Sequence, residues 1–211
     1  MQEESLARFL DQLASSAPTP GGGSVAALCG AISAALSSMV ANLTMGREKY
    51  LNVEPQVRAA LERSEQLRRR FVQLIDEDIA AYGALSAAYR LPKSTAEEQA
   101  ARSNQIQAAL TGAAEAPLRM AEQARQALEL CQTLAAIGNP NVISDVGVAT
   151  ITASAALESG ALNVLINLKT MKDRELATRL AQRLSAAQEG ADALRLAILT
   201  AVREKMGVDG V

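Results

Sequence analysis

Three segments of the sequence carry residues that could bind a ligand or move a proton, and the first is a glycine-rich run. Thr19-Pro20-Gly21-Gly22-Gly23-Ser24 stands directly before a long apolar stretch. Its glycines would let a ligand or another chain approach the backbone, and free amides at a helix start favour an anion. A tight turn between helices explains the same run equally well, and the lysine of a nucleotide-binding P-loop is absent. Gly21, Gly22, Gly23 and Ser24 are therefore candidate substrate-binding residues.

The other two segments supply candidate carboxylates. Asp145 stands in an otherwise apolar segment, where it is either a helix N-cap or a buried carboxylate held for function. Asp78 ends the acidic run Asp76-Glu77-Asp78, and its helical phase with Ile75 and Tyr82 predicts that it turns inward. A solvated acidic patch is the alternative for this run.

The composition restricts the chemistry. The chain has 211 residues and contains neither histidine nor tryptophan, which excludes Ser-His-Asp and Cys-His nucleophile systems and imidazole metal sites. We therefore expect no metal and no bound cofactor, and proton transfer by carboxylates, lysines, tyrosines or the substrate itself. The 21 basic and 23 acidic side chains give a net charge of −2, without the basic excess typical of nucleic-acid binding.

The cysteines and the N-terminus bear on location. Cys29 and Cys131 are the two cysteines of the chain, and Met1-Gln2-Glu3-Glu4 is acidic where a secretion signal would be basic. We expect free thiols in a reducing cytoplasm. The most apolar stretch, 25–40, is interrupted by Gly30 and three serines and is too short for a membrane span, so no membrane partner is expected.

Helices must position these residues. Turn-forming residues divide the sequence into segments with helical apolar spacing, which predicts a single all-α domain of five to seven helices over residues 1–211. The predicted helices cover about 3–15, 24–45, 54–89, 95–134, 144–167 and 173–206. Ser24 and Asp173 are predicted N-caps, and Ser94-Thr95-Ala96-Glu97-Glu98 offers a capping box in either of two registers. Pro117 predicts a kink or a break.

Two of these predicted helices are almost entirely apolar. The helix over 24–45 has no polar face and is expected to be buried on all sides. The segment 144–167 has β-branched residues that would suit a strand, but its length favours a helix, with Gly147 and Gly160 allowing close contact. Two such helices expose more apolar surface than one small bundle covers, which favours a homodimer through a helix face. The alternative is that both helices are simply central.

Six groups of residues, spread in order along almost the whole chain, form a recognisable set. They are 18–24, 39–47 with Tyr50, 76–78, 91–93, Gly138-Asn139 with Ser144-Asp145, and 163–168. Together they resemble the cyclodeaminase domain of formimidoyltransferase-cyclodeaminase and the free-standing bacterial methenyltetrahydrofolate cyclohydrolases of the same family. Each group is modest alone, but six in register are specific.

The resemblance implies an all-α fold that dimerises, with a tetrahydrofolate pocket near the subunit interface. It also implies one of two reactions at the same carbon. In the cyclodeaminase reaction, N10 of 5-formimidoyltetrahydrofolate attacks the amidine carbon and ammonia leaves, giving 5,10-methenyltetrahydrofolate. In the cyclohydrolase reaction, water adds to the methenyl cation and the ring opens to 10-formyltetrahydrofolate. Tyr50, Tyr82 and Tyr89 are the tyrosines available to stack on the substrate.

The resemblance also suggests roles for individual residues. Asp145 is the first choice for a carboxylate that stabilises charge and shuttles a proton, and Asp78 is the second; a pair would let one stay ionised while the other titrates higher. The glycine run would bind the pterin edge or a carboxylate. The remaining candidate substrate-binding residues are Arg47 and Lys49, for the glutamate tail, and Asn42, Asn163 and Asn167, for the pterin or for one another across an interface. A non-catalytic helical interaction protein is the alternative of a different class.

Overall fold

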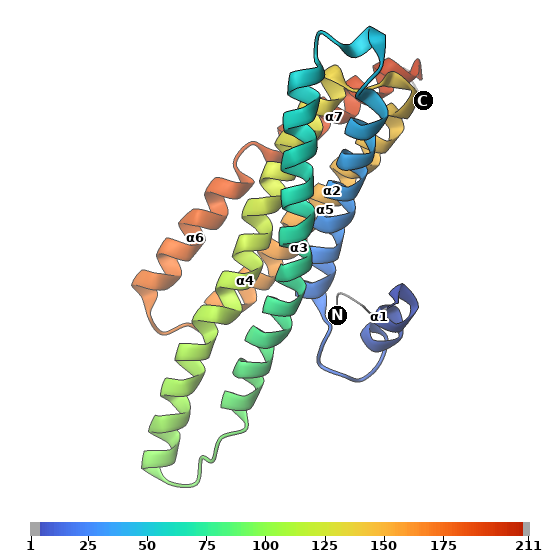
Figure 1. Cartoon of the computed structure of the whole chain (residues 1–211). Coiled ribbons are helices and arrows are strands. Elements are labelled where there is room, and N and C mark those ends of the chain that lie inside the picture. The colour runs from blue at the N-terminus through green and yellow to red at the C-terminus, as the bar shows by residue number, and fades with distance from the viewer. Residues whose placement is uncertain (1–4, 209–211) are drawn as a thin grey trace.

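The computed structural model describes residues 5–208, and all regular structure within that range is helical (Figure 1). This confirms the predicted all-α class. The α-helices are α1 (Leu6–Leu13), α2 (Gly22–Thr44), α3 (Glu54–Tyr89), α4 (Ala96–Ile137), α5 (Ile143–Leu168), α6 (Arg174–Gln188) and α7 (Ala191–Met206). Short 3-10 turns, Glu48–Tyr50 and Pro140–Val142, precede α3 and α5.

Helices α2, α3, α4 and α5 form a four-helix bundle in which each helix packs on the next and α5 returns to α2 (Figure 1). Helices α2 and α5 run antiparallel, because Gly22 at the start of α2 faces Asn163 near the end of α5. Further along, the Ser33 hydroxyl donates to the Ala149 carbonyl at 2.8 Å. Helix α6 packs on α4, and α7 packs on α4 and α5.

Helices α3 and α4 are much longer than their neighbours, with 36 and 42 residues. Their connected ends project as a hairpin past the start of α2 and the end of α5 (Figure 1). A capping box at Thr95 and Glu98 begins α4, where the Glu98 amide donates to the Thr95 hydroxyl at 3.2 Å, so one of the two predicted registers is confirmed. The step between long and short helices creates the recess described below.

Two local predictions were wrong, and one of two alternatives at Pro117 is excluded. The expected last helix is two helices, because Gly190 adopts a left-handed conformation (φ +66°) that ends the turn between α6 and α7. Of the kink or break predicted at Pro117, the break is absent, because α4 continues through that residue. Ser24 is not the N-cap of α2; Gly21 holds that position without a side-chain bond, and Ser24 lies inside the first turn.

Helix α2 is also not buried on all sides. Within the described chain, α2 and α5 share an exposed apolar surface, which we call the α2–α5 apolar face. Its large exposed members are Ile32, Met39 and Leu43 from α2 and Val148, Ile151, Leu162, Leu165 and Ile166 from α5. The opposite sides of both helices pack into the core, so the two helices are half core and half surface.

Length and composition alone would let α2 and the segment Pro140–Leu168 cross a membrane. In their most apolar windows, however, 61% and 50% of the residues are buried inside the bundle. Core helices of soluble proteins have this character, so the feature is weak evidence for a membrane span.

Candidate active site

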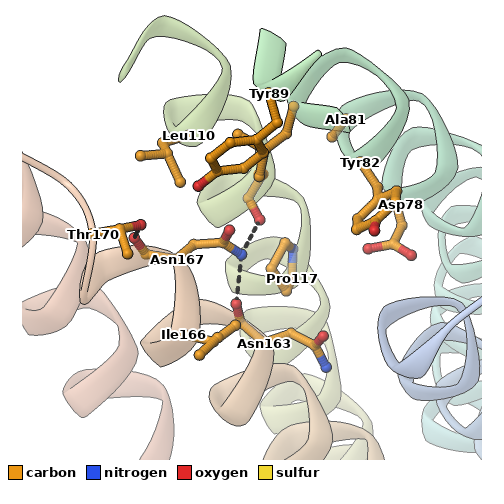
Figure 2. Close-up of a pocket in the computed structure, with 12 residues that line it drawn as sticks. Asp78, Ala81, Tyr82, Tyr89, Leu110, Pro117, Asn163, Ile166, Asn167 and Thr170 are labelled. Carbon is orange, nitrogen blue, oxygen red and sulfur yellow. Dashed lines mark hydrogen bonds between the residues drawn. The ribbon is translucent and has the colours of Figure 1, made fainter. Parts of the chain in front are cut away.

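A groove with a volume of about 320 Å³ lies where α3 and α4 pass the start of α2 and the end of α5 (Figure 2). Three helices supply its walls. It is lined by Asp78, Ala81, Tyr82, Leu85 and Tyr89 from α3, Leu110, Ala113 and Pro117 from α4, and Asn163, Ile166, Asn167 and Thr170 from α5 and the turn after it. Apolar walls with a few convergent polar groups are typical of small-molecule sites.

The carboxylate of Asp78 lies at the inner end of the groove, against the first turn of α2. The Ser24 hydroxyl donates to Asp78 Oδ2 at 3.1 Å. A Cβ added to Gly23 would lie 2.1 Å from Asp78 Oδ1, so the carboxylate occupies the space that a side chain would need. The anion that the glycine-rich helix start receives is therefore the protein's own carboxylate.

Burial raises the pKa of Asp78 above its ordinary value of 3.8. Hydrogen bonds from the side chain and backbone of Ser24 favour the ionised form and oppose this shift, but desolvation is the larger effect. A carboxyl with a raised pKa can accept and return a proton more readily near neutral pH than an exposed one. Asp78 thus has the environment of a proton shuttle.

The two other acids of the run are engaged differently. Asp76 is exposed. Glu77 accepts from Arg70 at 3.1 Å and from Arg119 at 3.2 Å, and the hydrogen bond with Arg70 lowers the pKa of Glu77. The prediction that Asp78 is the inward-facing acid agrees with its place on the groove.

Asn163 and Asn167 project from consecutive turns of α5 toward the groove (Figure 2). The Asn163 side chain donates to the Ser159 carbonyl at 2.8 Å, and that of Asn167 donates to the carbonyls of Asn163 (2.7 Å) and Ala113 (2.9 Å). Among the described residues no donor is bonded to either amide oxygen, so both oxygens can accept from a ligand.

The bond from Asn167 to Ala113 explains how α4 continues through Pro117. Proline has no N–H, so the carbonyl four residues earlier, that of Ala113, loses its partner within the helix. The Asn167 amide supplies the missing donor from α5. One asparagine therefore both repairs the helix and contributes an acceptor to the groove.

We predict that Asn167→Ala lowers the free energy of unfolding by about 1–3 kcal/mol, because it leaves the Ala113 carbonyl without a donor. Pro117→Ala restores a backbone N–H at that position, so the Asn167→Ala change should cost less in the Pro117→Ala background. Urea unfolding of the two single variants and the double variant measures this coupling. Equal costs of Asn167→Ala in both backgrounds would contradict the repair role.

The α3 wall of the groove is aromatic. Tyr82 follows Asp78 by four residues and Tyr89 follows Asp78 by eleven, so the three residues lie on the same side of the helix (Figure 2). Their side chains are 43% and 46% exposed. Exposed tyrosines along a groove provide flat surfaces for a ring system.

The remaining candidate residues lie at the far end of the bundle. Asn42, Arg47 and Lys49 are exposed near the end of α2, and Asp145 is half-buried in the first turn of α5 without forming an N-cap bond. Asp145 precedes Asn163 by 18 residues on one helix, a separation of about 27 Å. Within one chain the structure does not bring these four residues to the groove.

A buried hydrogen-bond network at that far end involves Asn139. Its side-chain amide donates to the Leu43 carbonyl at 3.1 Å, its backbone N–H donates to the Thr44 hydroxyl at 2.9 Å, and its Oδ1 accepts from the Tyr50 hydroxyl at 3.1 Å. Two of the six recognised residue groups, those containing Asn139 and Tyr50, therefore join the ends of α2 and α4. Sequence reasoning did not foresee this role.

Comparison with known proteins agrees with the arrangement. The family model for formiminotransferase-cyclodeaminase matches residues 5–186. A methenyltetrahydrofolate cyclohydrolase from Methylorubrum extorquens is 47% identical over 203 residues, which cover 96% of this chain and 98% of that protein. The formimidoyltransferase-cyclodeaminase of Rattus norvegicus is 34% identical over 184 residues, 87% of this chain and 34% of that longer protein.

Similarity extends to a solved structure. The crystal structure of formiminotetrahydrofolate cyclodeaminase from Thermotoga maritima superposes with a TM-score of 0.83 and 30% sequence identity, covering 98% of this chain and 97% of that one. The family match, the full-length relative and the shared fold together show that this chain belongs to the formiminotransferase-cyclodeaminase family.

Proposed function

We propose that this chain is a one-carbon folate enzyme that acts on the carbon bridging N5 and N10 of tetrahydrofolate. The observation that carries the proposal is the partly buried Asp78 carboxyl, held by Ser24 and Gly23 at the inner end of an apolar, partly aromatic groove. Cyclohydrolase activity is the first form to test, because the relative with that name is 47% identical and aligns over 98% of its own length.

In the cyclohydrolase reaction, a water molecule adds to the electrophilic methenyl carbon and the Asp78 carboxylate takes its proton. The resulting tetrahedral carbon is bonded to N5, N10 and a hydroxyl group. Asp78 then returns the proton to N5 as the C–N5 bond breaks, and the hydroxyl proton leaves to solvent as the formyl C=O forms. A carboxyl with a raised pKa suits both steps, since it must first accept and then donate.

The cyclodeaminase reaction is the second candidate, because the structural match has that name. Here N10 attacks the carbon of the formimidoyl group in its protonated, amidinium form, the N10 proton is taken up, and the leaving nitrogen receives one proton and departs as ammonia. The same carboxyl can accept the N10 proton and pass it to the leaving nitrogen. Both reactions need a proton shuttle beside one carbon, which Asp78 supplies without a metal or cofactor.

Asp78 replaces Asp145 as our preferred proton shuttle. Asp78 lies in the groove, whereas Asp145 lies about 27 Å from Asn163 along α5. We assign Asn163 and Asn167 to hydrogen bonding of the pterin through their free amide oxygens. Gly23 and Ser24 hold Asp78 in place, and we assign Gly21 and Gly22, which precede them, to bordering the ligand.

We further propose that the enzyme is a cytoplasmic homodimer formed through the α2–α5 apolar face. Its eight large apolar side chains would otherwise remain in water. An antiparallel two-fold pairing of α2 with its copy would place the end of one α2 beside the start of the other. Arg47, Lys49, Asn42 and Asp145 of one chain would then approach the groove of the second chain.

For the dimer we predict that Ile151→Glu, in the middle of the α2–α5 apolar face, produces a monomer, because the face would have to bury a charge. Leu196→Glu on α7 is a matched control, since Leu196 is exposed to a similar extent (55% against 53%) outside the face. Sedimentation velocity measures the outcome. A monomeric wild type, or dissociation by Leu196→Glu alone, would contradict the assignment.

The function is tested by a paired assay on the purified protein. Loss of the near-ultraviolet absorbance of 5,10-methenyltetrahydrofolate measures cyclohydrolase activity, and ammonia release from 5-formimidoyltetrahydrofolate measures cyclodeaminase activity. We expect at least one reaction to be catalysed. A helical interaction protein would catalyse neither and would bind no tetrahydrofolate in calorimetry, so that pair of results would refute the proposal.

A further inference from the structure

The groove continues outward from Asp78 along the projecting hairpin. From Asp78 to Tyr89, α3 advances eleven residues, or about 16 Å. The opposite wall passes from Asn163 through Asn167 to Thr170, where α5 has ended. The polar proton-transfer group thus lies at one end, and the other end opens at Tyr89 and Thr170 (Figure 2).

Arg102 of α4 borders the outer end through Tyr89. Its guanidinium donates to the Tyr89 carbonyl through Nε at 3.3 Å and Nη2 at 3.0 Å, and its Cζ lies 5.8 Å from the centre of the Tyr89 ring. Among the described residues Arg102 has no carboxylate partner. Its charge is therefore oriented by a carbonyl and a ring but is not neutralised.

Lys172 borders the same end from the turn after α5. Gln107 connects it to the groove, because Gln107 donates to the Thr170 carbonyl at 3.2 Å and accepts from the Lys172 amide at 2.6 Å. The Lys172 ammonium donates to the Ser103 hydroxyl at 2.7 Å, beside Arg102 in the sequence. Lys172 likewise has no carboxylate partner among residues 5–208.

Other arginines of the described chain form ion pairs with glutamates, such as Arg70 with Glu77 and Arg183 with Glu122. Asp173, the acid next to Lys172, is occupied as the N-cap of α6, where it accepts from the Leu176 amide at 2.9 Å. Arg102 and Lys172 are thus two cations that neutral groups hold in place at the open end of the groove and that lack a carboxylate partner in the described chain. Such a pair is suited to bind a carboxylate-bearing extension of the ligand.

We infer that the groove binds its folate in one direction, with the reacting carbon at Asp78, the aromatic middle along Tyr82 and Tyr89, and the anionic glutamate tail at Arg102 and Lys172. This inference rests on the proposed function and makes the outer end a subsite for substrates with several glutamates. It differs from a tail site at Arg47 and Lys49, which lie at the far end of the same chain's bundle and could approach the groove only from a second chain.

Steady-state kinetics with monoglutamyl and triglutamyl substrate test the inference. In Arg102→Ala and in Lys172→Ala we expect KM for the triglutamyl substrate to rise about 5- to 10-fold, with kcat within about twofold, and a smaller rise for the monoglutamate. Lys172→Ala is the variant less open to a structural explanation, because the Lys172 ammonium bonds Ser103 of α4 and makes no hydrogen bond to α3. Arg179→Ala, an exposed arginine on α6 paired with Glu175, should change neither constant.

The outcomes separate the two proposals. If the ratio of KM for the monoglutamyl substrate to KM for the triglutamyl substrate is unchanged in both Arg102→Ala and Lys172→Ala, the tail subsite is overturned while the enzyme proposal stays intact. The same conclusion follows if that ratio falls in Arg47→Ala or Lys49→Ala instead. If the wild type catalyses neither reaction, the enzyme proposal fails. The tail subsite is then judged by calorimetry with triglutamyl 5-formyltetrahydrofolate, where no loss of affinity in Lys172→Ala would overturn it as well.

Discussion

Asp78→Asn is expected to lower kcat by about 10²- to 10⁴-fold while the protein remains folded, because the amide keeps the shape of the carboxyl but cannot shuttle a proton. Ser24 can still donate to the remaining amide oxygen, so the first turn of α2 keeps its contact. The measurement is kcat for both candidate reactions, accompanied by thermal unfolding. Asp78 therefore carries the largest expected effect on activity.

Stability should respond in the opposite direction. Burial raises the pKa of Asp78 in the folded state above 3.8, so the folded protein loses stability as pH rises from 3.8 through that raised value. At pH 7 the partly desolvated, ionised carboxylate is a net cost, and a neutral amide removes it. We expect the Tm of Asp78→Asn at pH 7 to equal or exceed that of the wild type.

The pH profile gives a further check. If Asp78 acts as the base, kcat/KM falls on the acid side at a pH above the ordinary range of an aspartate, and Asp78→Asn removes this limb. Asp145→Asn is the discriminating comparison. Full activity in Asp78→Asn together with a large loss in Asp145→Asn would return the proton-transfer role to Asp145, placed at the groove by a second chain.

Gly23→Ala is expected to reduce kcat/KM by on the order of 10²-fold, because the new Cβ would lie 2.1 Å from Asp78 Oδ1 and must displace the carboxylate. Gly22→Ala is the matched variant one residue earlier. A Cβ there would lie 3.5 Å from Asn163 Nδ2, an ordinary contact, so we expect a far smaller loss. Kinetics of the two alanine variants under the same conditions measure the difference.

The mechanism of the Gly23→Ala loss can be isolated with a double variant. If the alanine acts by moving Asp78, adding it to Asp78→Asn should reduce activity little further, since the group it displaces has already lost its function. Independent, multiplying losses would show that Gly23 acts in another way, for example by direct contact with the substrate. Similar losses in Gly22→Ala and Gly23→Ala would exclude the steric explanation.

Local signals predicted much of the helical structure. The bounds of α3, Glu54–Tyr89, were predicted as observed, because Pro55 belongs in a first turn and Leu91-Pro92 ends the helix. Asp173 was correctly identified as a helix N-cap, because its carboxylate accepts a hydrogen bond from the Leu176 amide at the start of α6. Capping and periodicity depend on neighbours within a few residues, so the sequence contains the information they need.

The misses also have local or tertiary causes. Gly190 was overlooked because the apolar stripe continues in phase across it, although a glycine after a helix end is a known stop signal. The sequence left a break at Pro117 open, because the donor that replaces the missing N–H belongs to Asn167, which is 54 residues along the chain from Ala113. Periodicity contains no information about such a distant partner.

The sequence by itself determined the all-α class, most helix ends and the membership of the six residue groups in one family, because these rest on local patterns or on similarity. Only the tertiary structure decided which of those groups meet. Ser24 and Asp78, 54 residues apart, come into contact because α2 begins where α3 passes it, whereas Asp145 is carried to the other end of the bundle by the length of α5. A straight helix keeps its two ends apart by about 1.5 Å per residue, and helix packing alone selects which ends are neighbours.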